Sequence, residues 1–397
     1  MTHTVYYSAA GNYSEPEVRR ALDGILPPVL AACGGVAGKR ILLKPNLLFC
    51  RRPDDPATVH PAVITGVAAA LREAGAAEIV LLENPGTQTV RAVIDRMGIA
   101  GTLSAQGVFF DDFSDYRERT LPDVCVFRSL KIAREFERFD LVVDLAKAKT
   151  HAMMTLTLAV KNLFGLVDSA SRIGWHLAVG SDFKRFADLL LDLYLTVRPR
   201  ICIIDGIIGM EGNGPGSGTP TERNFLAASD DALALDASVA EKLGVPAKKL
   251  LLLQQAAKRG LEFSFEDAGA VPPVRPFRLP DPPGMLNAWG VILPPFCKTT
   301  LRNLVGSRPV VRKEICIGCG RCAEVCPPRS LKMSREKKPL FDLNHCIRCY
   351  CCQEHCPKGA ITTRQQLLTA FLSKLIKLVR RGNGSPSPHD SGFISSK

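Results

Sequence analysis

The chain has 397 residues, a net charge of +12 and 14 cysteines. This length is enough for two domains, one of them with a sizeable core. No run of about 18 apolar residues occurs, so we expect no membrane-spanning helix. The first residues do not combine a basic segment with an apolar run, which argues against a secretory leader; we therefore expect reduced thiols and a cytoplasmic location.

The first 267 residues alternate apolar runs with helical patterns. This alternation predicts an α/β domain with a mainly parallel sheet. We expect strands over residues 41–43, 78–82, 141–145 and 201–204, and helices over residues 60–75, 181–196 and 230–243.

Polar residues follow several of these apolar runs. In an open parallel sheet, ligands bind beyond the carboxyl ends of the strands. We therefore expect one crevice with substrate-binding and catalytic side chains from Lys44, Asn46, Glu83, Lys147, Lys149 and Asp205.

Residues 146–165 concentrate lysines with a histidine and an asparagine. Lys147, Lys149 and Lys161 provide point charges for a phosphate or carboxylate, together with Asn162. His151 can transfer protons near neutral pH. On composition alone, the alternative that these lysines are solvated surface charges is favoured, because lysines are mostly exposed. His176 is an isolated histidine that a structural role would also explain.

A glycine-rich segment occupies residues 209–220. Gly212 and Gly214 would allow backbone N–H groups to approach a ligand, and Glu211 is a candidate acid or ligand of a divalent metal. The segment is neither a dinucleotide fingerprint nor a Walker loop. A flexible surface loop is the alternative, and noncovalent flavin binding stays open.

The remainder of the chain divides into four segments. We expect a proline-rich linker over residues 268–310, a two-cluster domain over 311–362, a basic amphipathic helix over 363–381 and a disordered tail over 382–397. The helix has an apolar stripe and would either pack on its own protein or lie on an anionic membrane surface through residues 364–381.

Eight cysteines form two copies of the pattern C-x2-C-x2-C-x3-C-P. This is the two-cluster signature of bacterial ferredoxins, in which the fourth cysteine of each run ligates the other cluster. We predict a small α+β ferredoxin-like domain with two 4Fe–4S clusters. One is held by Cys316, Cys319, Cys322 and Cys356, and the other by Cys326, Cys346, Cys349 and Cys352. Zinc sites and disulfide frameworks have other spacings or settings. Cys351 is a spare thiol beside Cys352.

The positive charge is concentrated near the clusters. Residues 308–381 hold 16 Lys/Arg and 5 Asp/Glu, whereas residues 1–307 are nearly neutral. Such a basic region suits an acidic electron donor such as ferredoxin or flavodoxin. We expect no nucleic-acid partner, because no stacking aromatic residues interleave with the charges.

Several of these segments together resemble the family known as domain of unknown function 362, whose members are often fused to a 4Fe–4S ferredoxin domain. The resemblance covers roughly residues 40–245 and the cysteine-rich domain. It implies that the matching polar residues line a site, but it implies no reaction. The residues that carry it are Lys44-Pro45-Asn46, Lys147 to His151, Lys161 to Gly165, His176, Asp205-Gly206, Glu211 to Pro215, Gly218 and Ser229 to Asp236.

Three functions are compatible with the sequence. In the leading hypothesis, the clusters pass single electrons to an anionic small molecule in the α/β domain, with Lys161, His151, His176, Asp205 and Glu211 as catalytic residues. The second is an electron-transfer module without a substrate of its own. The third is a sensor or binding protein whose clusters respond to oxygen or iron.

Overall fold

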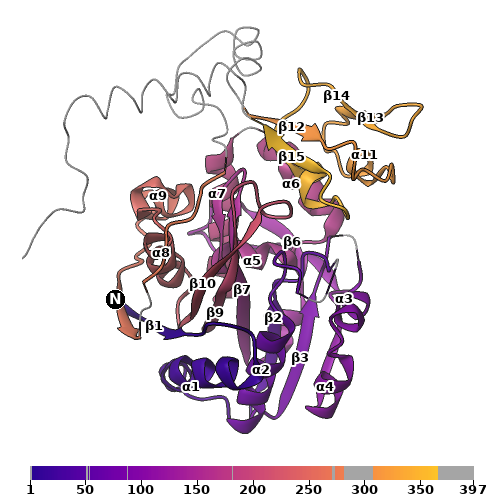
Figure 1. The fold of residues 1–397 in the computed structure, drawn as a ribbon. Coiled ribbons are helices and arrows are strands. Elements are labelled where there is room, and N and C mark those ends of the chain that lie inside the picture. Colours follow the sequence, from indigo (N-terminus) through magenta and orange to yellow (C-terminus); the bar gives the residue numbers. More distant parts are fainter. Residues whose placement is uncertain are drawn as a thin grey trace, which may run out of the picture.

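The large domain is a mainly parallel sheet covered by helices on both faces (Figure 1). The computed structural model describes residues 2–364, apart from residues 51, 53, 87, 181, 271–272 and 281–306. Within these residues the sheet has nine strands in the order β11-β1-β10-β9-β7-β2-β3-β4, with β8 paired to the end of β7. The predicted α/β fold with a mainly parallel sheet is therefore confirmed.

The central strands are parallel, and the antiparallel pairs are β1 with β10, β10 with β9 and β7 with β8. Almost every residue of the central strand β7 is buried, because helices cover both faces. The strands are β1 (His3–Ala9), β2 (Arg40–Pro45), β3 (Glu78–Glu83), β4 (Val108–Asp112), β7 (Leu141–His151), β8 (Thr155–Thr157), β9 (Ile201–Glu211), β10 (Thr219–Ser229) and β11 (Phe265–Gly269).

Two hydrophobic cores lie on opposite faces of the sheet. In β2, Ile41 and Leu43 belong to one core and Leu42 to the other, as the alternation of side chains along a strand requires. The first core is covered by α1 (Glu15–Ala32), α2 (Pro61–Glu73), α3 (Val90–Met97) and α4 (Ala100–Ala105). The second is covered by α5 (Ala159–Asn162), α6 (Ser169–Val179), α7 (Phe183–Val197), α8 (Ala232–Lys242) and α9 (Leu251–Lys258).

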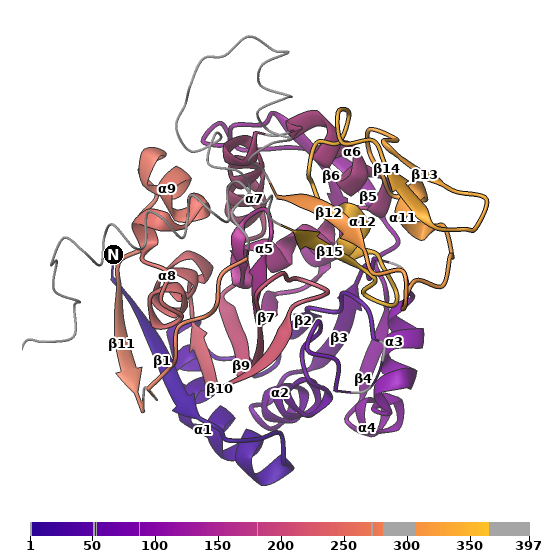
Figure 2. The same ribbon diagram turned by 45° about the horizontal axis from the view of Figure 1, so that its top comes forward.

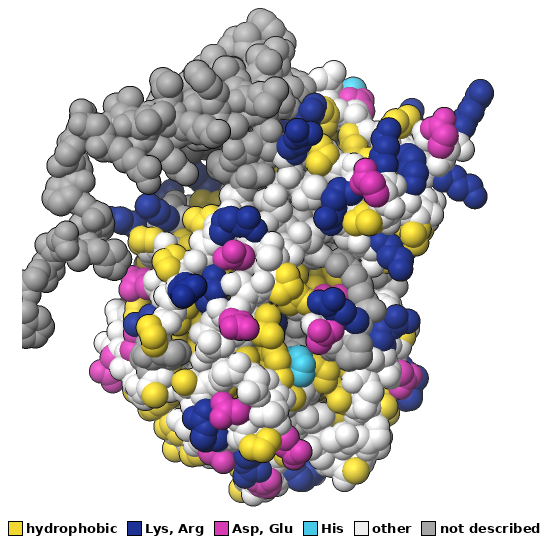
Figure 3. All heavy atoms as spheres, viewed as in Figure 1, with side chains coloured by type: hydrophobic (Ala, Val, Ile, Leu, Met, Phe, Trp, Pro, Cys, Tyr) yellow, Lys and Arg dark blue, Asp and Glu magenta, His cyan; other side chains and the backbone are white. Residues whose placement is uncertain are grey.

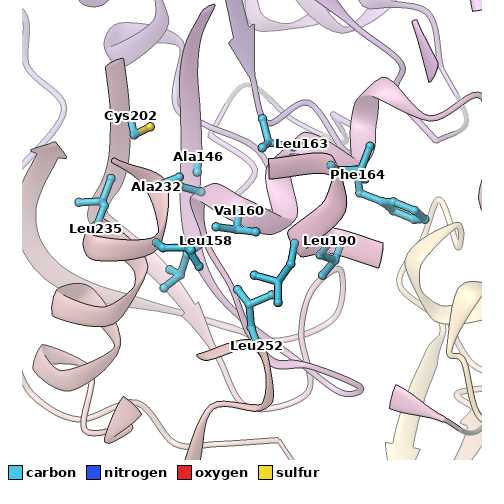
Figure 4. Packing of buried hydrophobic residues seen from close by; sticks show 14 of the residues in the cluster. Ala146, Leu158, Val160, Leu163, Phe164, Leu190, Cys202, Ala232, Leu235 and Leu252 are labelled. Carbon is cyan, nitrogen blue, oxygen red and sulfur yellow. The ribbon is translucent and has the colours of Figure 1, made fainter. Parts of the chain in front are cut away.

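Residues before and within α5 pack against α7 in the second core. Figure 4 shows Leu158, Val160 and Leu190 packed together, with the ring of Phe164 extending away from them. A hairpin of β5 (Tyr116–Thr120) and β6 (Ser129–Ala133) adds to the same side, since Leu130 and Ile132 belong to this core.

Residues 308–364, here called the cluster module, lie against the large domain (Figures 1 and 2). The module contains two antiparallel strand pairs and two short helices. The pairs are β12 (Arg308–Val311) with β15 (Ile361–Arg364) and β13 (Leu331–Met333) with β14 (Pro339–Phe341), and the helices are α11 (Arg321–Glu324) and α12 (Cys351–Glu354).

The glycine-rich segment after β9 holds the module in place. Gln353 donates from Nε2 to the carbonyl of Asn213 at 2.6 Å, and Asn213 donates from Nδ2 to the carbonyl of Thr363 at 3.2 Å. Ser217 donates from Oγ to the carbonyl of Ile361 at 3.1 Å. This segment is therefore part of the contact between the two regions.

Two features differ from the expected secondary structure. Strands β7 and β9 are longer than predicted: β7 continues through Lys147 and Lys149 to His151, and β9 continues beyond Asp205 to Glu211. Phe277, in the proline-rich segment, is buried in the second core. The predicted amphipathic helix and tail fall almost wholly outside the described residues. No helix in the described part of the chain is long and apolar enough to cross a bilayer.

Candidate functional site

A cavity lies between the large domain and the cluster module. Its wall comes from the ends of β2, β3 and β7, from α5 and α6, and from α12. The polar and sulfur-bearing residues that line it are Asn46, Glu83, Asn84, Lys149, Thr157, Lys161, Asn162, Arg172, His176, Cys351, Glu354 and His355. The cavity thus combines cations from one region with residues next to cluster ligands from the other.

Lys149 is held at the cavity wall by neutral partners. Its Nζ donates to Oδ1 of Asn46 at 2.6 Å and to the carbonyl of Ala57 at 2.7 Å. Burial lowers the pKa of Lys149 to about 7, and the positive charges of Lys161 and Lys147 add to this shift. Lys149 therefore changes charge near neutral pH.

Lys161 directs an ammonium group into the cavity. Among the described residues, no carboxylate lies within 4.0 Å of its Nζ, which sits 5.9 Å from the centre of the Phe164 ring. Burial lowers the pKa of Lys161, and the negative charge of Glu354 opposes that shift. An ammonium group in this position favours an anionic ligand.

Short-range contacts fix the helix that carries Lys161. Asp236 of α8 accepts from the backbone N–H groups of Ala159 at 2.8 Å and Val160 at 3.2 Å, so it supplies the cap that the start of α5 lacks. Asn162 donates from Nδ2 to Oδ1 of Asp144 at 2.7 Å. Burial raises the pKa of Asp144 to about 7.

Behind the cavity, Lys44 and Glu83 form a buried ion pair with 2.5 Å between Nζ and Oε2. Glu83 also accepts from the N–H of Asn84 at 2.9 Å. A Cβ at Gly165 would overlap the Glu83 carboxylate and the Lys44 ammonium group. Glycine at this position is therefore needed for the ion pair to fit beneath the Leu-Phe-Gly turn.

The cluster module contributes the opposite wall through Glu354. Its Oε1 lies 2.7 Å from Nε2 of His151, at the end of β7. Burial alone would raise the pKa of Glu354, but the charge of Lys161 and the contact with His151 hold it well below its usual range. The Glu354 carboxylate is therefore ionised at neutral pH.

The protonation of His151 follows from its other contacts. Its Nδ1 accepts from the N–H groups of Met153 at 3.1 Å and Met154 at 3.3 Å, which places the proton of the neutral ring on Nε2, facing Glu354. Burial lowers the pKa of His151 to about 4. His151 is therefore neutral at pH 7.

His176 is packed between aromatic rings at the cavity wall. Its ring stacks on Phe186 with centroids 4.9 Å apart and meets the edge of Phe164 at 5.8 Å. Burial lowers the pKa of His176 to about 3. A neutral imidazole is what this apolar packing accommodates.

Arg172 and His355 complete the cavity. Arg172 donates from Nη2 to the carbonyl of Asn84 at 2.8 Å. His355 is close to Gly86, where a Cβ would lie only 3.2 Å from the imidazole ring. Three cationic side chains thus line the cavity, whereas both of its carboxylates already contact a lysine or a histidine.

Four of the predicted cluster ligands, Cys316, Cys319, Cys322 and Cys356, line one cavity of the cluster module. This set combines three cysteines of the first run with the fourth of the second, which fits the predicted crossed ligation of two 4Fe–4S clusters. Crossed ligation would leave a second group of four, Cys326, Cys346, Cys349 and Cys352, for the other cluster.

Cys351 separates the second group from the cavity. It is buried, packs with Cys349 and Val325, and also lines the cavity. Ile173 of α6 packs against the same three residues. Cys349 is therefore separated from the cavity by the side chain of Cys351.

Several predicted site residues lie elsewhere. Lys147 pairs with Asp205 at 2.7 Å and donates to the Tyr13 hydroxyl at 2.7 Å. Glu211 contacts Arg223 at 2.9 Å. Gly212 accepts at its carbonyl from Thr150, and Gly214 also packs on Thr150, with Pro215 reaching the cavity instead. Among the described residues, no three His, Cys, Asp or Glu side chains are grouped around a site for a single metal ion.

Sequence reasoning missed Arg172, Glu354, His355 and the role of Cys351 in the cavity wall. The signal for two of them was present in the second cysteine run, where Gln-Glu-His separates Cys352 from Cys356. Such polar residues are unnecessary for holding a cluster. Arg172 has no local signal, because its contacts depend on the tertiary fold.

Comparisons with known proteins agree with this division of the chain. The profile of the domain of unknown function family DUF362 matches residues 41–241, which is just over half of the chain. The chain belongs to this family. The profile of a 4Fe–4S dicluster domain matches residues 315–360, so the cluster module of this family member binds 4Fe–4S clusters.

A related protein and a solved structure complete the comparison. The thylakoid-associated protein sll1697 of Synechocystis sp. (strain ATCC 27184 / PCC 6803 / Kazusa) is 35% identical over 238 residues, which cover 59% of this DUF362 chain and 73% of that protein. The lactate racemase apoprotein from Thermoanaerobacterium thermosaccharolyticum aligns with a TM-score of 0.36 at 14% identity. That alignment covers 58% of this chain and 54% of the racemase chain, about half of its length.

Proposed function

We propose that this protein is an iron–sulfur reductase that transfers single electrons through its cluster module to an anionic small molecule. The observation that carries this proposal is the shared cavity wall. Lys149, Lys161 and Arg172 come from the large domain, whereas Cys351 and Glu354 come from the helix that contains the ligand Cys352. A molecule in the cavity would contact both the cations and the protein surrounding a cluster.

We infer the order of electron transfer from the predicted ligand that lies nearest the cavity. Electron tunnelling is fast only over short distances, so the cluster that reduces the substrate must adjoin the cavity. The group around Cys349 meets this condition through Cys351, which touches both. The group around Cys316 would then receive electrons first.

The cavity also supplies charge and protons. Each electron that the substrate accepts adds one negative charge, which a proton must neutralise. Because His151 and His176 are neutral at pH 7, we assign proton donation to the lysines with lowered pKa values, Lys149 and Lys161. Arg172 keeps its charge and would orient the anion.

The test is an anaerobic reoxidation experiment. Protein with both clusters is reduced and mixed with fractions of a metabolite extract, while cluster absorbance is followed. The variants are Lys161→Ala and, as a matched control, Lys184→Ala, which changes an exposed lysine on α7. We expect one fraction to reoxidise the wild type and the control, with at least about a tenfold loss of rate in Lys161→Ala.

The opposite outcome points to the second hypothesis. If no fraction reoxidises the protein, and only protein carriers exchange electrons with all three forms at equal rates, the protein is an electron-transfer module. Iron content measured for each variant separates a loss of the cavity cation from a loss of clusters.

A further inference from the structure

The two cluster sites differ in their access to solvent. Cys319 is exposed, and Ile317, which lines the same cavity, has 59% of its surface accessible. In contrast, Cys349 is 7% exposed and packs with Cys351 and Val325, against Ile173 of the large domain. Of the eight predicted cluster ligands only Cys319 is exposed, so a protein that exchanges electrons with the module can approach a ligand most closely at Cys319.

The surface around Cys319 has an apolar centre. Ile315 and Ile317 flank the ligand Cys316, and both are exposed. Lys338 donates from Nζ to the carbonyl of Cys316 at 2.7 Å, so the start of β14 lies against the same loop. Exposed apolar side chains grouped in this way mark sites of protein contact.

Positive charge surrounds this centre. Residues 308–364 contain 12 Lys/Arg and 5 Asp/Glu. Figure 3 shows Lys and Arg side chains gathered over the cluster module at the upper right of the molecule. Two bound clusters, at about −2 each with their thiolates, would leave the module net positive. Such a surface attracts an acidic protein before contact.

A groove beside Cys319 extends this positive surface towards the large domain. Arg312, Arg321 and Lys358 line it from the cluster module, and Arg52 and Arg96 line it from the large domain. The acidic residues along it are Asp55 and Glu324. The groove therefore presents more cations than carboxylates next to an exposed cluster ligand.

We propose that this face, defined by Ile315, Ile317, Cys319 and the lysines Lys313 and Lys358, docks an acidic one-electron carrier protein. The carrier delivers one electron at a time to the cluster held by Cys316, Cys319, Cys322 and Cys356. The carrier is oxidised and the cluster reduced by the same electron, so no further reactant is needed. This inference rests on the electron path of the proposed function, and it does not depend on which molecule occupies the cavity.

The experiment measures reduction of the clusters in the full-length protein without any cavity ligand. A reduced, acidic two-cluster ferredoxin is the probe, mixed anaerobically by stopped flow at about 10 mM ionic strength, where electrostatic forces extend about 30 Å. The test variant is Lys313→Glu/Lys358→Glu. The control is Lys248→Glu/Lys249→Glu, which makes the same change in charge at two exposed lysines before α9.

We expect the test variant to be reduced at least about tenfold more slowly than the wild type, and the control to differ by less than about twofold. Reduction by the cationic methyl viologen radical should not slow in the test variant, which shows that its clusters still accept electrons. The wild-type rate with ferredoxin should also fall steeply as salt is added.

Equal rates for the test variant and the wild type, or an equal loss in the control, would overturn the proposal. A wild-type rate that is independent of ionic strength would do so even if the test variant failed to assemble clusters. None of these readouts involves Lys161 or a metabolite. Failure of this proposal is therefore distinguishable from failure of the proposed reductase function.

Discussion

The two cysteine runs have the same spacing but different surroundings. Gly318 and Gly320 of the first run have φ angles of 68° and 79°. The equivalent residues of the second run, Arg348 and Tyr350, have φ angles of 59° and 61°. The backbone path is thus repeated, although a left-handed conformation costs a residue with a side chain about 1–2 kcal/mol. Arg348 and Tyr350 both donate to the carbonyl of Ser307, which gives these side chains a structural role.

The residues between the third and fourth cysteines differ more strongly. Glu324 of the first run is exposed and pairs with Arg321 at 3.0 Å. The equivalent Glu354 is buried beside His151 and lines the cavity. Gln353, equivalent to Ala323, binds the glycine-rich segment of the large domain. The two cysteine runs thus share one backbone path, but the segment around Glu324 in the first run faces solvent, whereas the segment around Glu354 in the second run lines the candidate site. The runs differ in residues that are not cluster ligands.

We expect the largest difference between the two cysteine runs when one cluster ligand is removed from each run in turn. We expect Cys349→Ser and Cys319→Ser each to lose one cluster, so that iron falls from about eight to about four per chain. Because the group around Cys349 adjoins the cavity, Cys349→Ser should abolish reoxidation by the active metabolite fraction. Cys319→Ser should keep the cluster that adjoins the cavity.

Electron paramagnetic resonance of the reduced variants checks this assignment. Addition of the active fraction should change the spectrum of Cys319→Ser and leave that of Cys349→Ser unchanged. A change of the same size in both variants would mean that the two clusters are equally close to the bound molecule.

Exchange of each glutamate for glutamine tests the two halves without removing a cluster. Glu354 is a negative charge near Lys161, so Glu354→Gln should lower the pKa of Lys161 further and reduce its protonated fraction at alkaline pH. We expect reductase turnover at pH 8 to fall about tenfold and the alkaline limb of the pH profile to move to lower pH. Glu324→Gln should leave the profile unchanged. Identical pH profiles of turnover for the two variants would show that Glu354 does not influence the reaction.

Much of the fold could be predicted from local patterns. Apolar runs identified strands in β2, β3, β7 and β9, and cysteine spacing identified the 4Fe–4S domain. The ends of β7 and β9 could not be predicted, because Lys147 and Asp205 read as strand ends until tertiary pairing buries both. Burial of an ion pair inside a sheet depends on partners that are distant in sequence.

The candidate site could be predicted only in part. Lys149, Lys161, Asn162 and His176 were selected, and the structure brings all four to one cavity. Glu354 was not selected, because its role depends on how the cluster module packs against the large domain. Only the structure shows which of these lysines lines the cavity. Lys147 and Lys149 are two residues apart, yet they bind different partners.

A rise in pH should weaken anion binding in the cavity, because Lys149 loses its charge. The pKa of Lys149 is lowered from its usual value to about 7, so the lysine is charged below that pH and neutral above it. Binding of a divalent anion such as sulfate should therefore weaken as pH rises from 6 to 8, by roughly tenfold for the loss of one charge. Calorimetric titration of the wild type and Lys149→Met measures this change. A wild-type affinity that is constant over this range would show that Lys149 does not contact the anion.

The smallest effect concerns the backbone frame that the two halves share. Nothing lies within 4 Å of a Cβ built at Gly320, so Gly320→Ala tests the left-handed conformation without a steric clash. We expect a loss of about 1 kcal/mol in the free energy of unfolding of the cluster-loaded protein. Gly101→Ala is the control, because Gly101 is equally unobstructed but lies in α4, where alanine should stabilise by about 0.5–1 kcal/mol. Anaerobic denaturant unfolding measures both variants. Changes of opposite sign in the free energy of unfolding would show that the left-handed conformation at position 320 is unfavourable for a residue with a side chain. Arg348 and Tyr350 must then offset the same cost through their contacts with Ser307, whereas a neutral Gly320→Ala would mean that the second run needs no such compensation.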